Sequence, residues 1–204
     1  AYYNPPFNEI AYPAGILQPP MFDMGADDAV NYGAIGAVIG HEMGHGFDDQ
    51  GSKFDAEGNL KNWWTPEDRK KFEDRAACVI DQYNTLEVGD GLHHTGKLVI
   101  GEALGDLGGL TLAFKAYQRS LHGKPGPVMD GFTAEQRFFL SFARVWASQD
   151  RPESMRLRLN TDPHPLPKWR AIGTLQNMPE FQKAFQCKQG DPMVRPVEKQ
   201  CKLW

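Results

Sequence analysis

A pair of histidines four positions apart constrains the fold of this chain most strongly, because it forms the pattern H-E-x-x-H at residues 41–45. Residues four apart lie on the same face of a helix, so His41 and His45 can present two imidazoles to one metal ion. Glu42 lies beside them, where a hydrolase needs a base for the attacking water. The pattern predicts a zinc-dependent hydrolase. The alternative is two histidines on a buried helix face.

The helix that carries this pattern should start near Asp27 and Asp28, whose charges suit a helix N-terminus, and run to about Phe47. Its apolar residues recur at helical spacing. Its glycines make it intrinsically weak, at about 1 kcal/mol for each glycine in the interior. We therefore expect close packing in the middle of the domain to hold it. The glycines are Gly33, Gly36, Gly40, Gly44 and Gly46.

Size and charge favour a single unit that does not bind nucleic acid. The 204 residues suffice for one core, and a net charge of −4 argues against an electrostatic surface for nucleic acid. Peptides or small neutral substrates fit better. The apolar runs are too short to span a membrane, and residues 1–5 lack the layout of a signal peptide. Three cysteines are too few for a disulfide scaffold.

A second helix should begin at Gly101 and place Glu102 and Asp106 on one face. Two explanations compete for these carboxylates. Acids in a first helical turn complement the helix dipole, although Asp106 lies one turn deeper. A catalytic zinc site, in contrast, needs a third protein ligand and usually a carboxylate behind a ligand histidine. Glu102 and Asp106 offer both.

Capping residues and prolines divide the rest of the chain into short elements. Thr65 and the proline after it predict a helix through about Tyr83, and a capping box at Thr133 predicts another through Trp146. Residues 1–25 suit an edge strand and an extended loop, whose backbone can hydrogen-bond a peptide substrate.

The remaining segments are expected to be mostly loop. Residues 151–170 are rich in proline and should form a surface loop that carries His164 and Arg170. The other expectations are a loop at residues 48–62, a loop at residues 87–96 that exposes His93 and His94, a short strand at residues 98–100, and a last short helix from Asn177.

Taken in order, these motifs resemble the neprilysin family of zinc endopeptidases, and the match extends over residues 1–204. An ordered series of this kind is far more specific than any one motif. It consists of residues 1–3, residues 13–20, H-E-x-x-H-G-F-D-D at residues 41–49, E-x-x-x-D at residues 102–106, Asp162 and His164 followed by Arg170, and the C-terminal C-x-x-W at residues 201–204.

The resemblance implies one zinc ion per chain, held by His41, His45 and Glu102. It implies that Asp106 orients His41, and that Asp48 is the partner of His45. Glu42 would take the proton of the attacking water and pass it to the leaving amine.

The resemblance also gives roles to residues that composition alone places on the surface or in the core. It implies that His164 donates a hydrogen bond to the developing oxyanion and that Arg170 binds a carbonyl of the substrate backbone. It further implies a hydrophobic pocket for the residue after the scissile bond, so substrates should be oligopeptides with a hydrophobic residue there. The pocket residues are Ile16, Met21, Ala37, Val38, Val145 and Trp146.

The implied fold is α+β and thermolysin-like, mainly helical, with a small sheet that exposes one edge and two central helices that carry the metal ligands. A disulfide between Cys78 and Cys201 is implied too, which suits an extracytoplasmic protein. Cys187 would pair with a cysteine upstream of Ala1. The large N-terminal lobe of the family has no counterpart in this chain, so we expect a catalytic domain that works with a missing lobe of the same protein.

Two other functions compete with an active peptidase. One is a binding module that keeps zinc only to stabilise its fold. The other is a catalytic fragment that is inactive without its N-terminal part. Glu42 separates the first of these from an enzyme, because a structural zinc site has no use for a base and normally closes its fourth coordination position.

Overall fold

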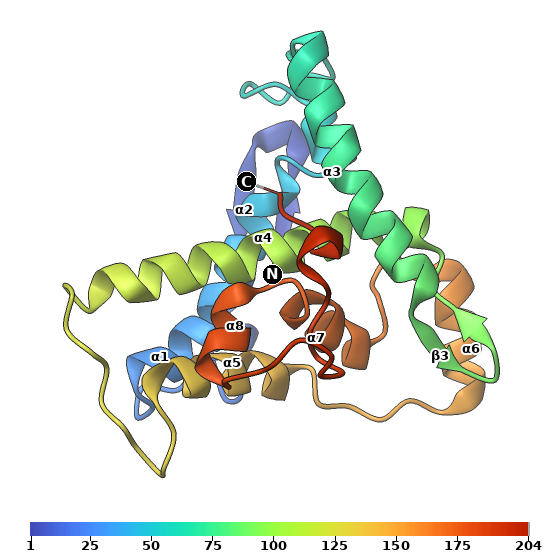
Figure 1. The fold of residues 1–204 in the computed structure, drawn as a ribbon. Coiled ribbons are helices and arrows are strands. Elements are labelled where there is room, and N and C mark those ends of the chain that lie inside the picture. Colours follow the sequence, from blue (N-terminus) through green and yellow to red (C-terminus); the bar gives the residue numbers. More distant parts are fainter. Residues whose placement is uncertain (204) are drawn as a thin grey trace.

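Helices make up most of the structure, which agrees with the predicted α+β fold that is mainly helical with a small sheet. The computed structural model describes residues 1–203, and Trp204, the end of the C-terminal motif, lies outside the described residues. Figure 1 shows the arrangement of the helices. They are α1 (Asp28–Asn31), α2 (Ala37–His45), α3 (Pro66–Thr85), α4 (Gly96–Ser120), α5 (Ala134–Val145), α6 (Pro152–Thr161), α7 (Pro167–Leu175) and α8 (Pro179–Ala184).

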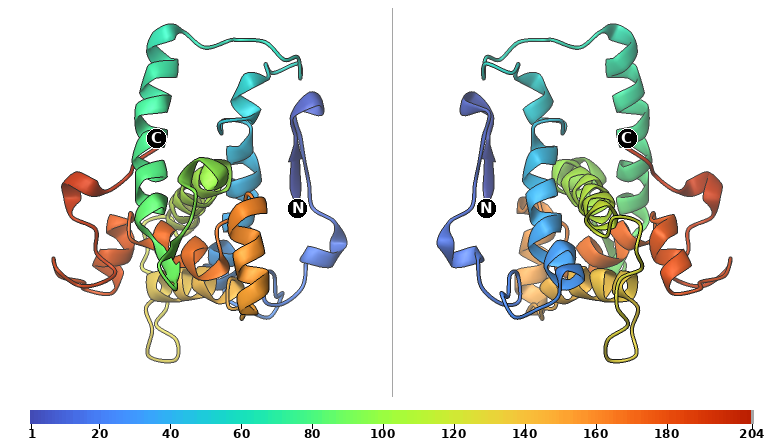
Figure 2. Two further views of the ribbon diagram at one scale, coloured as in Figure 1. Left: turned by 90° about the vertical axis from the view of Figure 1, so that its right-hand side faces the viewer. Right: turned by 90° about the vertical axis from the view of Figure 1, so that its left-hand side faces the viewer.

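Within residues 1–203 the strands form two antiparallel hairpins. In the first, β1 (Tyr2–Asn4) pairs with β2 (Glu9–Ala11), so that Tyr3 lies opposite Ile10. This hairpin lies beside α2 in both views of Figure 2 and confirms the edge strand expected near the N-terminus. The second pairs β3 (Glu87–Gly89) with β4 (Leu92–His93) just before α4.

The two helices that carry the histidines and the carboxylates, α2 and α4, form the centre of the fold and pack on each other more extensively than any other pair of elements. Glycines allow this approach. A Cβ atom on Gly40 would lie 2.6 Å from the backbone oxygen of Gly109, and one on Gly109 would lie 2.4 Å from the backbone nitrogen of His41. The expected burial of the glycine-rich helix is therefore confirmed, and its weak intrinsic propensity is offset by this contact.

The helical segment before α2 contains a feature that the periodicity does not predict. Asp27 caps α1 by accepting a hydrogen bond from the backbone of Ala29, as the acidic start suggests. A π-helical turn at Tyr32–Gly36 then separates α1 from α2. α2 ends at His45, close to the expected end at Phe47. The π turn places Gly33 against the backbone of Phe138 on α5, where a Cβ atom would clash.

The start of α4 bears on two expectations, the short strand at residues 98–100 and the helix-dipole explanation for Glu102. The short strand predicted at residues 98–100 is wrong, because α4 begins at Gly96. Val99 and Ile100 are buried, so core packing outweighs the preference of their branched side chains for strands. Glu102 is consequently the seventh residue of α4. It lies beyond the first turn, so the helix dipole does not account for it.

Two predicted loops are also wrong. Residues 87–96 form the hairpin of β3 and β4, and His94 is buried rather than exposed. Residues 151–170 contain α6 and the start of α7, and Arg170 is buried as well. Both helices have proline in the first turn, where it is favoured, so the prolines mark helix starts and not a loop.

The other predicted helices are confirmed. α3 begins after Thr65, whose side chain accepts from the backbone of Asp68. α5 begins with the capping box of Thr133 and Gln136 and buries its phenylalanines in the core. Residues 48–62 are mostly loop, as expected, with a short 3-10 turn at Gly51–Lys53.

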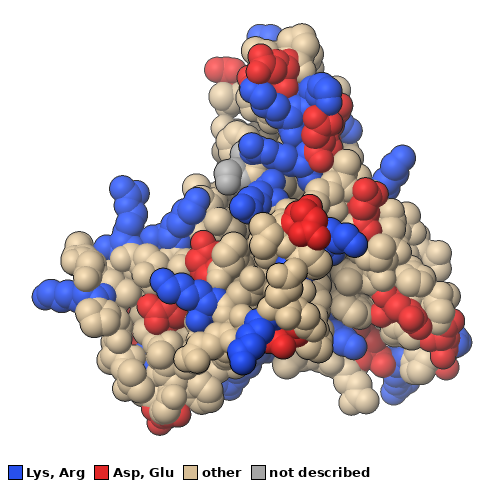
Figure 3. Space-filling model, viewed as in Figure 1, with Lys and Arg blue, Asp and Glu red and all other residues tan. Residues whose placement is uncertain are grey.

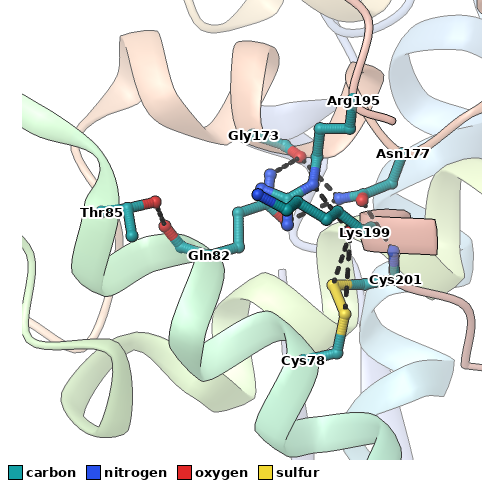
Figure 4. Close-up of a disulfide and its surroundings, with 8 residues drawn as sticks. All are labelled: Cys78, Gln82, Thr85, Gly173, Asn177, Arg195, Lys199 and Cys201. Carbon is teal, nitrogen blue, oxygen red and sulfur yellow. Dashed lines mark hydrogen bonds between the residues drawn. A yellow bond between two sulfur atoms is a disulfide. The ribbon is translucent and has the colours of Figure 1, made fainter. Parts of the chain in front are cut away.

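The disulfide between Cys78 and Cys201 is present and confirms the pairing that the resemblance implies. It joins α3 to the C-terminal segment across 123 positions. Figure 4 shows its surroundings, where the backbone N–H of Cys201 donates to Oδ1 of Asn177 at 2.9 Å. Cys187 is free among the described residues.

The surface in Figure 3 carries both signs of charge, interleaved. On α3 these charges include ion pairs one helical turn apart, such as Lys70 with Asp74 and Lys71 with Glu67. Within residues 1–203, none of the helices combines the length and hydropathy of a membrane span.

Candidate metal centre and active site

The two histidines of α2 and Glu102 of α4 bring their ligating atoms together. Nε2 of His41 lies 3.2 Å from Oε2 of Glu102, and Nε2 of His45 lies 3.6 Å from Oε1 of the same carboxylate. All three side chains are largely shielded from solvent. The helix pairing that the glycines permit therefore places the E-x-x-x-D motif opposite H-E-x-x-H.

Each histidine is held from behind by a carboxylate. Nδ1 of His41 lies 2.9 Å from Oδ1 of Asp106, and Nδ1 of His45 lies 2.7 Å from Oδ2 of Asp48. Asp48 is itself fixed, because its Oδ1 accepts from the backbone N–H groups of Gln50 and Gly51 at 2.8 and 2.7 Å. A proton on each Nδ1 leaves each Nε2 free to ligate a metal.

Glu42 lies in the same cluster but further from the histidine nitrogens. The ligating atoms of His41, Glu42 and His45 all lie within 4.8 Å of one another, so proximity alone would admit Glu42 as a ligand. Its Oε2, however, lies 4.0 Å from Nε2 of His45, whereas Glu102 approaches both histidines more closely. The geometry therefore favours Glu102 as the third ligand and leaves Glu42 beside the site as a buried carboxylate.

Arg170 enters the site from α7 and binds the carboxylate behind His41. Its Nε donates to Oδ2 of Asp106 at 2.8 Å, and its Nη2 donates to Oδ1 of Asp106 at 2.6 Å. Nη2 also lies 3.3 Å from Oε2 of Glu102. Burial raises the pKa of Asp106, but the charge of Arg170 and the hydrogen bond from His41 outweigh burial and lower the pKa to about 2.

The pKa of His41 is strongly raised by its carboxylate neighbours. Burial lowers its pKa, but the hydrogen bonds to Asp106 and Glu102 outweigh burial and raise the pKa to about 9. A metal ion must bind the neutral imidazole, so metal binding at neutral pH should release this proton.

His164 reaches the carboxylate of Glu102 from the segment between α6 and α7. Its Nδ1 lies 2.7 Å from Oδ1 of Asp162, and its Nε2 lies 3.3 Å from Oε2 of Glu102. The backbone N–H of His164 also donates to Asp162. Burial raises the pKa of Asp162, but these hydrogen bonds outweigh burial and lower the pKa to about 2. His164 stays 44% exposed at its side chain, so it is open to a substrate.

These residues line one cleft of about 540 Å³, with the N-terminal hairpin on one side. The six residues named for a hydrophobic pocket all line this cleft, and so do all the ligand, base, His164 and Arg170 positions. Sequence reasoning missed Ala34 and Phe142, which also line it. Phe142 lies one helical turn before Trp146, so helical spacing could have found it.

The donor set fits zinc. Two imidazoles and one carboxylate are the protein ligands of several catalytic zinc sites, and here the partner of each Nδ1 fixes the ring orientation. Within residues 1–203, the surroundings of His41 and His45 are the one place where three or more His, Cys, Asp or Glu side chains could hold a metal ion.

Comparison with known proteins agrees with this geometry. The sequence model of peptidase family M13 matches residues 1–202. The chain is 46% identical over its whole length to an endothelin-converting enzyme homolog of Locusta migratoria and to neprilysin-1 of Caenorhabditis elegans, and it covers 28% of each of these proteins.

A solved structure is similar as well. A Mycobacterium tuberculosis zinc metalloprotease in complex with an inhibitor superimposes with a TM-score of 0.97 at 46% identity, over all of this chain and 32% of that one. The chain therefore spans less than a third of the length of these relatives. The resemblance to the neprilysin family is confirmed, and the chain belongs to peptidase family M13.

Proposed function

We propose that this chain is the catalytic domain of a zinc-dependent endopeptidase that hydrolyses oligopeptides. The observation that carries the proposal is the convergence of His41, His45 and Glu102, with the buried carboxylate of Glu42 beside them. One zinc ion per chain, bound by these three side chains, would supply Lewis-acid polarisation of the scissile carbonyl and lower the pKa of the attacking water.

Glu42 acts as the general base in this proposal. Its carboxylate takes the proton of the attacking water and later delivers it to the leaving nitrogen. Glu42 is 6% exposed, so it is shielded from bulk water, which strengthens its interaction with a nearby proton donor. No covalent bond between enzyme and substrate is required.

His164 and Arg170 act on the substrate. Asp162 holds Nδ1 of His164 and leaves Nε2 to donate to the oxygen that becomes negative during attack. Arg170 uses Nε and Nη2 for the carboxylates of Asp106 and Glu102, and Nη1 has no partner within residues 1–203. Nη1 is therefore the group of Arg170 that can donate to a carbonyl of the substrate backbone.

The specificity proposed here is for a hydrophobic residue immediately after the scissile bond. The apolar part of the cleft wall supports it, since the pocket side chains contribute no charge there. In such a pocket, one methylene group of fit changes the free energy of discrimination by about 1 to 3 kcal/mol.

We further propose that the chain works with an N-terminal lobe of the same protein, outside the reducing cytoplasm. Its relatives are more than three times longer, and a lobe over the cleft would exclude water from the reacting groups. The disulfide between Cys78 and Cys201 suits an oxidising compartment.

A comparison of Glu42→Gln with the unchanged full-length protein tests the proposed activity. The variant should keep its zinc and lose most of its kcat/KM on an oligopeptide, because the ligands remain and the base does not. Glu57→Gln is the matched control, because Glu57 is an exposed glutamate that does not line the cleft. Full activity of Glu42→Gln would contradict the role of Glu42 as the base, and a zinc-loaded unchanged protein without peptidase activity would leave the zinc-stabilised binding module.

A further inference from the structure

Two parts of the proposed substrate site, the hydrophobic pocket and Arg170, share one side chain. Trp146 lines the cleft among the pocket residues. The same indole ring also supports Arg170, because the guanidinium carbon of Arg170 lies 3.9 Å from the ring centroid. The resemblance accounts for the first contact and says nothing about the second.

The stacking contact completes the fixation of the guanidinium group. Asp106 binds the edge that carries Nε and Nη2, which fixes the group within its own plane. A ring stacked on the guanidinium face opposes rotation out of that plane. The contact is closer than the other cation–π contacts within residues 1–203, which measure 5.3 Å for Arg69 over Phe72 and 4.9 Å for Lys168 over Trp169.

Ring packing, and not a hydrogen bond from its N–H group, holds the indole of Trp146 in place. Nε1 of Trp146 is buried and has no hydrogen-bond partner among the described residues, which costs free energy in a folded protein. The ring is held instead by an edge-to-face contact with Phe142, at 6.2 Å between centroids and 79° between planes. A phenylalanine would keep an aromatic face here without the unpaired donor.

We propose that Trp146 is a positioning residue for Arg170, which holds the guanidinium plane so that Nη1 faces the substrate. This inference rests on the proposed peptidase function. It implies that the pocket wall and the support of Arg170 are coupled, so that a change at Trp146 weakens binding of the substrate backbone even when the pocket is empty.

Two oligopeptides that differ only after the scissile bond separate the two roles of Trp146. A peptide with leucine there fills the pocket, and a peptide with glycine leaves it empty. The variants are Trp146→Leu, Trp146→Phe, Arg170→Met and the double variant with Leu at 146 and Met at 170, all in the full-length zinc-loaded protein. Val145→Ala is the matched control, because it enlarges the same pocket but its apolar side chain offers Arg170 no aromatic face.

With the glycine peptide, Trp146→Leu should lower kcat/KM about tenfold when Arg170 is present and less than twofold when Arg170 is replaced by Met. Trp146→Phe should retain most of the rate with this peptide. Val145→Ala should reduce the rate with the leucine peptide more than with the glycine peptide. Equal losses with and without Arg170, or a loss from Trp146→Leu confined to the leucine peptide, would overturn the inference.

Crystal structures of Trp146→Phe and Trp146→Leu give a readout that does not depend on activity. The guanidinium group should keep its place in the Phe variant and rotate away from the wild-type plane in the Leu variant. An unchanged Arg170 in the Leu variant would overturn the inference. If the wild-type protein shows no peptidase activity that Glu42→Gln removes, the proposed function fails, and the crystallographic comparison alone decides the role of Trp146.

Discussion

Nδ1 of His41 lies 2.9 Å from Oδ1 of Asp106, a carboxylate that also accepts two hydrogen bonds from Arg170. One buried side chain on α4 thus orients a candidate metal ligand from α2 and a candidate substrate-binding group from α7. The pairing explains why an acid lies one turn beyond Glu102, where neither the helix dipole nor solvent exposure requires it.

Asp106→Asn should weaken zinc binding about 10- to 100-fold, because the carboxylate that fixes the ring of His41 is lost. It should also lower kcat/KM at saturating zinc, since Arg170 loses the closer of its two carboxylate partners. Competition against a chelator of known affinity measures the first effect. Asp74→Asn on the exposed face of α3 is the control. Zinc affinity and saturated activity both at the wild-type level would contradict this role.

Acid should destabilise the fold through His94. Burial lowers the pKa of His94 to about 4, below its usual value of 6.5. The unfolded chain therefore binds this proton at a higher pH than the folded chain does. The stability contributed by the neutral ring is complete above about pH 6.5 and falls by up to about 1.4 kcal/mol per pH unit down to about pH 4.

Urea unfolding of the wild type and of His94→Gln between pH 4 and 8 checks this. Near neutral pH the variant should be less stable, because Nε2 of His94 accepts from the backbone N–H of Leu166 at 3.0 Å. Its stability should fall less steeply in acid. Parallel pH curves for the two proteins would assign the acid sensitivity to other groups.

Gly40→Ala should separate α2 from α4. The added methyl group would lie 2.6 Å from the backbone oxygen of Gly109, and overpacking of this kind costs about 1 to 3 kcal/mol of unfolding free energy. Zinc affinity should fall too, because Glu102 would move away from the histidines. Gly15→Ala is the control, since nothing lies within 4 Å of its added Cβ atom. Equal thermal midpoints for both variants would show that α2 and α4 pack differently.

Removing the disulfide should lower stability substantially. The bond between Cys78 and Cys201 joins positions 123 apart, and on the entropic account such a crosslink contributes about 5 kcal/mol. The double Ser variant should therefore unfold at much lower denaturant concentration, while Cys187→Ser, which breaks no bond within this chain, should change less. Peptide mapping without reduction gives an independent check, and two free thiols at 78 and 201 would exclude the bond.

A further prediction concerns the thiol of Cys187 in the full-length protein. In the full-length protein, Cys187 should be disulfide-bonded to a cysteine of the N-terminal lobe, which the same peptide mapping detects. A free Cys187 in the oxidised full-length protein would refute that pairing.

Ala37→Met should narrow the proposed pocket, because the buried side chain of Ala37 lines the cleft. The variant should cut peptides with alanine after the scissile bond at near the wild-type rate and lose rate on leucine and phenylalanine, by about 1 to 3 kcal/mol of transition-state stabilisation. A peptide library read by mass spectrometry measures the preference. Preferential cleavage before aspartate or lysine by the wild type would contradict the pocket.

Local signals in the sequence were sufficient for the helix that carries the histidines and for two helices outside the metal centre. The spacing of His41 and His45 required a helix, and the caps at Thr65 and Thr133 located two others. These features act over one or two turns, so they can be read without knowledge of the fold. The glycines of α2 also predicted its burial, since a weak helix needs tertiary support.

Several of the failures involve long-range contacts. The branched side chains of Val99 and Ile100 favour the strand predicted at residues 98–100, but their burial in α4 decides the conformation. Composition alone places Arg170 in a proline-rich surface loop, but its side chain is buried. Its partner, Asp106, lies 64 positions earlier, and only the family resemblance indicated a role for it. The stacking of Trp146 on Arg170 left no sequence signal.

The most direct test of the account is a zinc-edge anomalous difference map of the full-length protein. We expect one peak per chain, bonded to Nε2 of His41, Nε2 of His45 and a carboxylate oxygen of Glu102 at about 2.0 to 2.2 Å, with Glu42 near the metal but not ligating it. A chain without a zinc peak, or a zinc ion bound by Glu42 in place of Glu102, would contradict the assignment of ligands and base.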